Sequence, residues 1–244
     1  MFRIVGIADL LKPAALAFAG LCVLTPATAP AQETGTLITN RSAEIDARGR
    51  DAARRTMDAF TACIVSRYSG RAAALTRLPI DSPQYDRVAR NMFDSVGDEC
   101  ISGSGQLSFS DALFRAGIFQ ALYAREFGDN GPTDFSAVAT SGYRQLYGET
   151  LSPRVRQALA LEQFGECVAR ADAAGVRGLL GQIPGSAGER AAISGLRPSL
   201  ANCIPRDETI AFSPSILRGA LAEGIYRLSV AVRTQPASQS SGAR

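Results

Sequence analysis

The sequence contains no histidine and no tryptophan. Its one lysine is Lys12, so every basic residue in the body of the chain is arginine. Without histidine the chain cannot form a Ser-His-Asp or Cys-His nucleophile pair, or a zinc or iron site that depends on imidazole. The position of the lysine also excludes a Schiff-base lysine and a phosphate-loop lysine in the body of the chain. These absences remove most of the common enzyme classes.

The remaining composition is that of an ordinary globular protein. The 244 residues are 46% hydrophobic and 20% charged, with a formal net charge of +3. The charges of both signs are spread along the chain, whereas nucleic-acid binding needs a clustered basic face. We therefore expect no nucleic-acid partner.

Residues 1–31 have the three parts of a signal peptide. Arg3 and Lys12 precede an apolar run from Ala14 to Leu24, and Ala29-Pro30-Ala31 fits the cleavage pattern before Gln32. An apolar run of that length rises only about 16 Å as a helix, too little to cross a hydrocarbon core of about 30 Å. We therefore predict cleavage, a periplasmic or secreted protein, and no transmembrane segment after cleavage. The alternatives are a retained anchor and a lipoprotein, although Leu21 stands where the latter has a small residue before its cysteine.

The second half of the chain repeats features of the first half. The spacing is 104 residues at the first cysteine of each half and 103 residues farther along. The recurring pairs are Phe60 and Phe164, Cys63 and Cys167, Cys100 and Cys203, Phe109 and Phe212, Ser110 and Ser213, Arg115 and Arg218, and Tyr123 and Tyr226. Positions paired by these spacings are called aligned below. We predict a tandem duplication, with module 1 at 32–127, a linker at 128–151, module 2 at 152–231 and a disordered tail at 232–244.

Hydrophobic periodicity predicts an all-α fold with about four helices in each module. The clearest helix is expected over 213–229, where Ser213 is a good N-cap and an apolar stripe follows at helical spacing. Other helices are expected from about Ser42 to Tyr68, Ser82 to Val96, Ser110 onward, Ser152 to Ala171, Ala173 to Leu180 and Ser186 to Ala201, with locally extended chain at Gln106–Phe109 and Thr209–Phe212. Tyr143 to Tyr147 can add a helical turn within the linker.

Four cysteines remain after the predicted cleavage, and export favours disulfides. The repeat favours Cys63–Cys100 with Cys167–Cys203, because these spacings are nearly equal, at 37 and 36 residues. The cross-module pairing of Cys63 with Cys167 and Cys100 with Cys203 also respects the repeat. There is no C-x-x-C pair, so neither a zinc site nor a redox site is expected.

Arginine and tyrosine residues at aligned positions are candidates for binding. Arg115 and Arg218 can anchor an anion, or can pair locally with acids such as Asp111 and Glu223. The same two interpretations apply to Arg67 and Arg170, which follow the first cysteine of each module, and Tyr123 and Tyr226 can bind a ligand or lie at the edge of the core. The structural interpretation is the simpler one for all six residues.

Carboxylate pairs are the remaining route to acid–base catalysis. Glu162 and Glu166 lie four residues apart and so share one helical face. Asp98 and Glu99 precede Cys100, where the second module has no acid. Gly103-Ser104-Gly105 lacks the lysine of a phosphate loop and is interpreted as a turn. We assign no catalytic residue, cofactor or metal from the sequence.

The segment 164–226 resembles a group of secreted, uncharacterised proteins. They share F-x-E-C-V-x-R, then L-x-x-x-P-G-S, a second cysteine, and F-S-x-x-x-L-R-G-x-x-A-E-x-x-Y. The matching residues are Phe164, Glu166, Cys167, Val168, Arg170, Leu180, Pro184, Gly185, Ser186, Cys203, Phe212, Ser213, Leu217, Arg218, Gly219, Ala222, Glu223 and Tyr226. The first module departs from the pattern with Ala62, Ala116 and Gln120. The resemblance implies export and architecture, and carries no activity.

These observations favour an exported non-catalytic protein that binds a protein, a peptide or a small ligand in the cell envelope. One alternative is a carboxylate-dependent hydrolase of cell-wall polymer, with Glu166 as the first acid to test. Another is a carrier of an apolar ligand such as a lipid. A pocket holding a desolvated carboxylate favours the hydrolase, and an exposed apolar groove without one favours binding.

Overall fold

A computed structural model of the chain describes residues 37–38, 47–101, 107–147, 151–204 and 212–235. The predicted signal peptide, Gly103–Gly105 and the end of the predicted tail lie outside these residues. Within them, no helix combines the length and the apolar character needed to cross a membrane.

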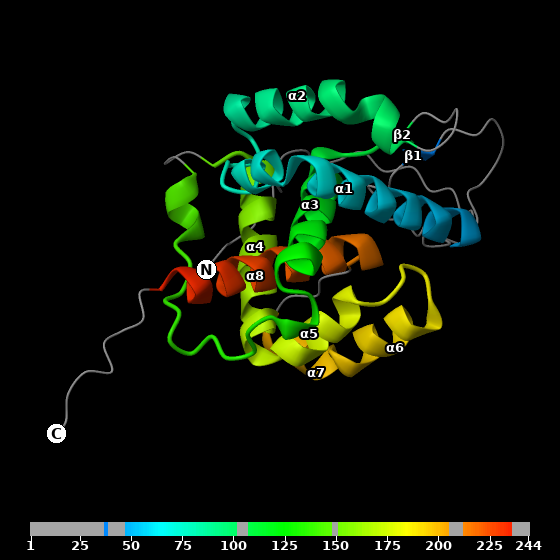
Figure 1. Cartoon of the computed structure of the whole chain (residues 1–244). Coiled ribbons are helices and arrows are strands. Elements are labelled where there is room, and N and C mark those ends of the chain that lie inside the picture. Colours follow the sequence, from blue (N-terminus) through cyan, green and yellow to red (C-terminus); the bar gives the residue numbers. More distant parts are fainter. Residues whose placement is uncertain (1–36, 39–46, 102–106, 148–150, 205–211, 236–244) are drawn as a thin grey trace, which may run out of the picture. The chain divides into compact units, whose positions relative to one another are not determined.

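The described residues are helical, which confirms the predicted all-α class (Figure 1). The α-helices are α1 (Ala47–Leu75), α2 (Pro83–Cys100), α3 (Asp111–Glu126), α4 (Pro153–Ala171), α5 (Ala173–Leu180), α6 (Ala187–Gly195), α7 (Arg197–Asn202) and α8 (Pro214–Thr234). Two 3₁₀ helices, η1 (Gly128–Asn130) and η2 (Tyr143–Leu146), lie in the predicted linker, the second at the expected turn. The two short strands β1 (Leu37–Ile38) and β2 (Leu107–Ser108) pair antiparallel.

Serine caps begin five of these helices. In each case the hydroxyl oxygen accepts a hydrogen bond from the backbone N–H three residues on, which satisfies a donor that the first helical turn leaves free. The caps are Ser82, Ser110, Ser152, Ser186 and Ser213. Proline follows the cap of α2, α4 and α8, where its fixed φ suits the first turn. The predicted helix starts are therefore correct at these positions.

The first helix of each half is interrupted at aligned positions. Within α1, Tyr68 has non-helical angles (φ −131°, ψ 42°), so the helix bends there and continues to Leu75. The aligned residue Asp172 (φ −152°, ψ 71°) ends α4 and begins α5, and its side chain accepts a hydrogen bond from Gly175 N. The region that mirrors α2 is divided into α6 and α7, a division that the sequence analysis did not predict.

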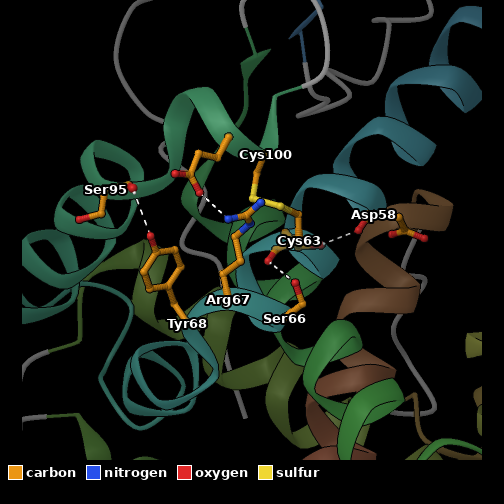
Figure 2. Close-up of a disulfide and its surroundings, with 9 residues drawn as sticks. Asp58, Cys63, Ser66, Arg67, Tyr68, Ser95 and Cys100 are labelled. Atoms are coloured by element: carbon orange, nitrogen blue, oxygen red, sulfur yellow. Dashed lines mark hydrogen bonds and ion pairs between the residues drawn. A yellow bond between two sulfur atoms is a disulfide. The ribbon is translucent and has the colours of Figure 1, made fainter.

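Each predicted module contains its own disulfide. Cys63 of α1 joins Cys100 of α2, and Cys167 of α4 joins Cys203 just after α7. The Cα–Cα distances are 5.7 and 5.8 Å. The first bridge lies beside an ion pair between Arg67 and Glu99 (Figure 2). The favoured pairing is confirmed, and the cross-module alternative is wrong.

Helix α8 is the centre of the core and contacts both α3 and α4, which it crosses in Figure 1. Leu221, Ile225 and Leu228 of α8 are fully buried, as are Ile118 and Leu122 of α3. The linker contributes Phe135, Val138, Tyr143 and Tyr147 to the buried residues. Residues 135–147 of the linker thus contribute to the packed core.

Helices α4 and α8 approach each other through glycine. A Cβ atom on Gly165 would lie 1.9 Å from the carbonyl oxygen of Ala220, and one on Gly224 would lie 2.3 Å from the carbonyl carbon of Gly165. Neither backbone contact can be relieved by a side-chain rotation. The two glycines therefore set the separation of these helices.

We expect Gly165→Ala to lower the free energy of unfolding by about 3 kcal/mol, because the added methyl group must push α4 away from α8. Gly178→Ala in α5 is the matched control, since a Cβ there meets nothing within 4 Å. The control should be neutral or slightly stabilising, by up to about 1 kcal/mol. Urea unfolding of both variants measures the difference, and equal stability of the two variants would contradict the packing.

Candidate functional site

Two buried arginines reach across the contact between α3 and α8 in a reciprocal way. Arg115 of α3 donates through Nη2 to Glu223 Oε1 of α8 at 3.1 Å, and Arg218 of α8 donates through Nε to Gln120 Oε1 of α3 at 3.3 Å. Glu223 and Gln120 are aligned positions, each five residues beyond the arginine of its own helix. Each arginine therefore binds the corresponding side chain of the other helix.

Backbone carbonyls complete both arginine sites in the same manner. Arg115 also donates to Thr76 O at 3.4 Å and Leu78 O at 2.9 Å. Arg218 donates to Leu179 O at 2.7 Å and Leu180 O at 3.2 Å, in the aligned part of the other half. Both side chains are buried, and each is satisfied largely by carbonyl oxygens of its own half of the chain.

Ala116 and Gly219, which directly follow the two arginines, are aligned positions and contact each other. A Cβ atom on Gly219 would lie 2.4 Å from the Cβ atom of Ala116, its aligned residue. A residue that contacts its own equivalent marks the axis of a two-fold related pair. The contact between α3 and α8 therefore has the pattern of an isologous interface within one chain.

An open pocket of about 430 Å³ lies on the Arg115 side of this contact. We call it the Arg115 pocket. It is lined by Ile80, Phe109, Ser110, Asp111, Ala112, Arg115, Ala116, Arg154, Gln157, Ala158, Leu161, Glu162, Ile216, Gly219, Ala220 and Glu223. Its size is in the range typical of small-molecule sites, and its walls combine apolar side chains with a few charged ones.

Glu162 of α4 is a carboxylate that this pocket leaves partly unpaired. Its side chain is 2% exposed, and its Oε1 atom accepts a hydrogen bond from the hydroxyl of Tyr147 at 2.8 Å. Arg115 Nη2 lies 3.7 Å from the same oxygen. The Oε2 atom is buried and has no hydrogen-bond partner among the described residues. Burial, and next the neighbouring Glu223 carboxylate, raise the pKa of Glu162 to about 7.

Glu223 has the opposite electrostatic setting. Burial alone would raise its pKa, but the guanidinium groups of Arg115 and Arg227 outweigh burial and hold the pKa of Glu223 below its usual range. Arg227 donates to Glu223 Oε1 through Nη2 at 2.7 Å. Of the two buried glutamates of the pocket, Glu223 is therefore firmly ionised and Glu162 titrates near neutral pH.

The outer part of the Arg115 pocket carries a surface ion pair. Arg154, at the start of α4, donates to Asp111 at 2.6 Å and lies 3.7 Å from Asp81. Its side chain is 48% exposed. This arginine holds the beginning of α4 against the beginning of α3, beside the pocket.

The aligned space on the Arg218 side is much smaller. Its cavity, the Arg218 pocket, has a volume of about 40 Å³ and is lined by Arg54, Met57, Asp58, Leu113, Ala116, Gly117, Gln120, Pro184, Ser215, Arg218 and Gly219. Met57 and Asp58 are aligned with Leu161 and Glu162 of the open pocket. The side chain of Arg54 lies here, where its guanidinium is bound by both oxygens of Glu189. The residue aligned with Arg54 is Ala158.

The difference between the two pockets therefore has a simple local cause. At one position of the first helix of each half, module 1 has a long arginine and module 2 has a methyl group. Arg54 lines the small pocket and Ala158 lines the large one. The sequence comparison contained this pair but did not single it out, because an alanine carries no chemistry of its own.

The structure gives the other predicted arginines and tyrosines local partners. Arg67 forms an exposed pair with Glu99, whereas Arg170 donates to carbonyl oxygens of the linker, including Phe135 O at 2.8 Å. The hydroxyl of Tyr123 accepts from Arg177 Nε at 3.3 Å, and that of Tyr226 donates to Glu126 at 3.1 Å. The acids suggested as local partners bind arginines of other helices instead: Glu223 of α8 binds Arg115 of α3, and Asp111 of α3 binds Arg154 of α4.

Glu166, the acid favoured by the sequence analysis, is engaged through Oε1, while its Oε2 atom, like that of Glu162, is buried and has no hydrogen-bond partner among the described residues. It accepts hydrogen bonds from Arg170 Nη2 at 2.7 Å and from Ser141 N at 3.2 Å. Burial opposes ionisation, but these hydrogen bonds hold the pKa of Glu166 below its usual range. The arrangement ties the linker to α4. The side chain of Asp98 and the segment Gly103–Gly105 lie outside the described residues.

Among the described residues, no group of three histidine, cysteine, aspartate or glutamate side chains is placed to hold a metal ion. A comparison of the chain with family models, curated proteins and solved structures found no match. The site is therefore defined by its own geometry.

The setting of Glu162 predicts a dependence of stability on pH. Its pKa is raised from an ordinary 4.5 to about 7, so the folded chain binds a proton that the unfolded chain releases. The stabilising contribution is complete below pH 4.5 and is lost as the pH rises through about 7. At one pKa unit per 1.36 kcal/mol, the loss amounts to about 3 kcal/mol.

We therefore expect the wild type to lose stability between about pH 5 and pH 8, while Glu162→Gln does not. The difference in unfolding free energy between variant and wild type should shift in favour of the variant over this range. Thermal unfolding across this range measures the difference. Glu99→Gln, at an exposed position, is the control and should follow the wild-type profile. Parallel profiles for the wild type and Glu162→Gln would show that Glu162 ionises normally.

Proposed function

We propose that this chain is an exported, non-catalytic helical protein of two related modules, and that it binds a small ligand in the Arg115 pocket. The observation that carries the proposal is the difference between two aligned pockets, a small one lined by Arg54 and a large one lined by Ala158. The two disulfides support an oxidising compartment, in agreement with the predicted signal peptide. The reciprocal contacts of Arg115 and Arg218 support a tandem duplication.

The pocket has the features of a ligand site. Apolar side chains such as Phe109, Leu161 and Ile216 line it, and they provide surface that a ligand would remove from water. The charged groups lie on three different helices, α3, α4 and α8, so a ligand held among them would contact parts of both modules. A site of this kind couples ligand binding to the stability of the contact between α3 and α8.

A fragment screen by ligand-observed NMR tests this proposal. The wild type is compared with Ala158→Arg, which places the residue found in the small pocket into the large one. We expect fragments that bind the wild type to lose binding in Ala158→Arg, while Arg156→Ala, at an exposed position of the same helix outside the pocket lining, retains most of them. Fragments that bind both proteins equally, or a wild type that binds none, would overturn the proposal.

A carboxylate-dependent hydrolase is the second candidate, and one observation favours it. Glu162 and Glu223 contact the same arginine, and their pKa values are displaced in opposite directions, as in an acid–base pair. In this candidate Glu162, rather than Glu166, is the general acid. Turnover of a cell-wall glycan panel that is lost in Glu162→Gln and kept in Glu166→Gln would support the hydrolase. The same panel without turnover leaves binding as the function.

The charged lining of the Arg115 pocket gives less support to a lipid carrier. An acyl chain is stabilised by a continuous apolar cavity, whereas this pocket places three carboxylates and two arginines among its walls. A ligand with a polar head and a short apolar body fits the lining better.

A further inference from the structure

The Arg218 pocket contains a guanidinium group at a position where the Arg115 pocket has only the methyl group of Ala158. The guanidinium of Arg54 extends into the Arg218 pocket and is held there by Glu189, with Asp51 at 3.3 Å. Asp58, which lines the same pocket, lies 3.9 Å from Arg218 and accepts a hydrogen bond from Gln120. The Arg218 pocket therefore has the cationic side chain of Arg54 in its wall, together with Asp58, the residue aligned with Glu162.

Glu162, the aligned residue that lines the open pocket, has one unpaired acceptor oxygen. Glu162 Oε2 is buried in the structure and has no hydrogen-bond partner among the described residues, while Oε1 is bound by Tyr147. A buried carboxylate oxygen without a donor is unfavourable unless a bound group supplies one. This observation is independent of the comparison between the two pockets, and it also concerns the acid beside the position of Ala158.

We propose that the Arg115 pocket binds a small organic cation, an ammonium or guanidinium group on an apolar body, with the cationic group donating to Glu162. The inference rests on the proposed function and adds the class of ligand. The apolar body would contact Phe109, Leu161 and Ile216, which line the same pocket. The cation would occupy the space that the guanidinium of Arg54 fills in the Arg218 pocket.

The charges around the site agree with a cation better than with an anion. Arg115 already donates to Glu223, Thr76 O and Leu78 O, so an anion would have to compete with bonds that are made. Arg227 is likewise engaged by Glu223, and Arg154 by Asp111. Among the described residues, the buried carboxylate oxygens without a hydrogen-bond partner are Glu162 Oε2 and Glu166 Oε2, and of these two residues Glu162 lines this pocket. An added cation would pair with Glu162 and favour its ionised form.

Three probes of matched length test the class of ligand: 4-phenylbutylamine, 4-phenylbutan-1-ol and 5-phenylpentanoate. Binding of each is measured by isothermal titration calorimetry to the wild type, Glu162→Gln and Ala158→Arg. We expect the amine to bind the wild type about 10-fold or more tightly than the alcohol, because a hydrogen bond between charged partners is stronger than a neutral one. Glu162→Gln should remove this preference while the alcohol binds about as before.

The outcomes separate this proposal from the one on which it rests. If the alcohol or the carboxylate binds the wild type as tightly as the amine, the class of ligand is wrong and the pocket remains a binding site. The class is also wrong if the amine preference persists in Glu162→Gln. If none of the probes binds, or if all bind Ala158→Arg as well as the wild type, both the class of ligand and the site are wrong. Circular dichroism confirms that each variant is folded.

Discussion

Replacing Arg115 with methionine is expected to lower the free energy of unfolding by about 3–5 kcal/mol. Arg115 is 4% exposed, and its guanidinium is the shared partner of Glu223 and Glu162. Its removal leaves two buried carboxylates with less compensation, together with the carbonyl oxygens of Thr76 and Leu78. Methionine keeps much of the apolar volume, so the loss reports mainly the charge and its hydrogen bonds.

Urea unfolding of Arg115→Met measures this loss, and Arg67→Met is the matched control. Arg67 also pairs with a glutamate, but both side chains are more than half exposed, so its loss should lie within about 0.5 kcal/mol. The double variant Arg115→Met with Glu223→Gln should lose less than the sum of its parts, because the two residues share one interaction. A small loss in Arg115→Met, or strict additivity in the double variant, would mean that the buried cluster contributes little to the fold.

Removal of either disulfide is also expected to lower the free energy of unfolding by a large amount. The bridges close loops of 37 and 36 residues, and the chain-entropy relation gives about 4 kcal/mol for a loop of that size. The double serine variants Cys63→Ser with Cys100→Ser and Cys167→Ser with Cys203→Ser should therefore lose similar amounts. This is a large fraction of the 5–15 kcal/mol typical of a whole domain.

Guanidinium unfolding of the two double variants, and of the wild type under reducing conditions, measures these contributions. The reduced wild type should be less stable than either variant, because it lacks both bridges. If the free energy of unfolding of either variant fell by less than about 1 kcal/mol, the disulfides would not be a major source of stability. A strongly unequal loss would show that one half of the chain is held together by other contacts.

Local signals in the sequence account for much of the fold. Serine caps, three of them followed by proline, fix where helices begin, because they act on the backbone of the first turn and need no distant contact. The pairing of the cysteines followed from their nearly equal spacing in the two halves. The first helix was expected to end near Tyr68, but it only bends there and continues to Leu75.

The candidate site was accessible to prediction only in part. The sequence drew attention to Glu162, Arg115 and Glu223, but it gave priority to Glu166, whose arginine partner lies four residues on at Arg170. An i, i+4 pair of this kind is a local signal that the glutamate is engaged. The free oxygen of Glu162 is a consequence of tertiary packing, and the opening of the pocket comes from the small size of Ala158. Neither has a signature in one half of the sequence alone.

The residues at aligned positions of the two halves carry most of the functional information in this chain. Where both halves have the same residue, as with Arg115 and Arg218, the shared contacts are structural. Where they differ, as at Arg54 and Ala158 or at Gln120 and Glu223, the difference distinguishes a small pocket from a large one. Such differences are visible in the sequence once the structure shows which positions surround a cavity.

Amide chemical-shift mapping with 4-phenylbutylamine tests most directly whether the Arg115 pocket is the ligand site. The account predicts the largest shifts at Ala158, Leu161 and Glu162, with little change at the aligned residues Arg54, Met57 and Asp58. Shifts centred on Arg54 to Asp58, or scattered over surfaces away from α4, would contradict it.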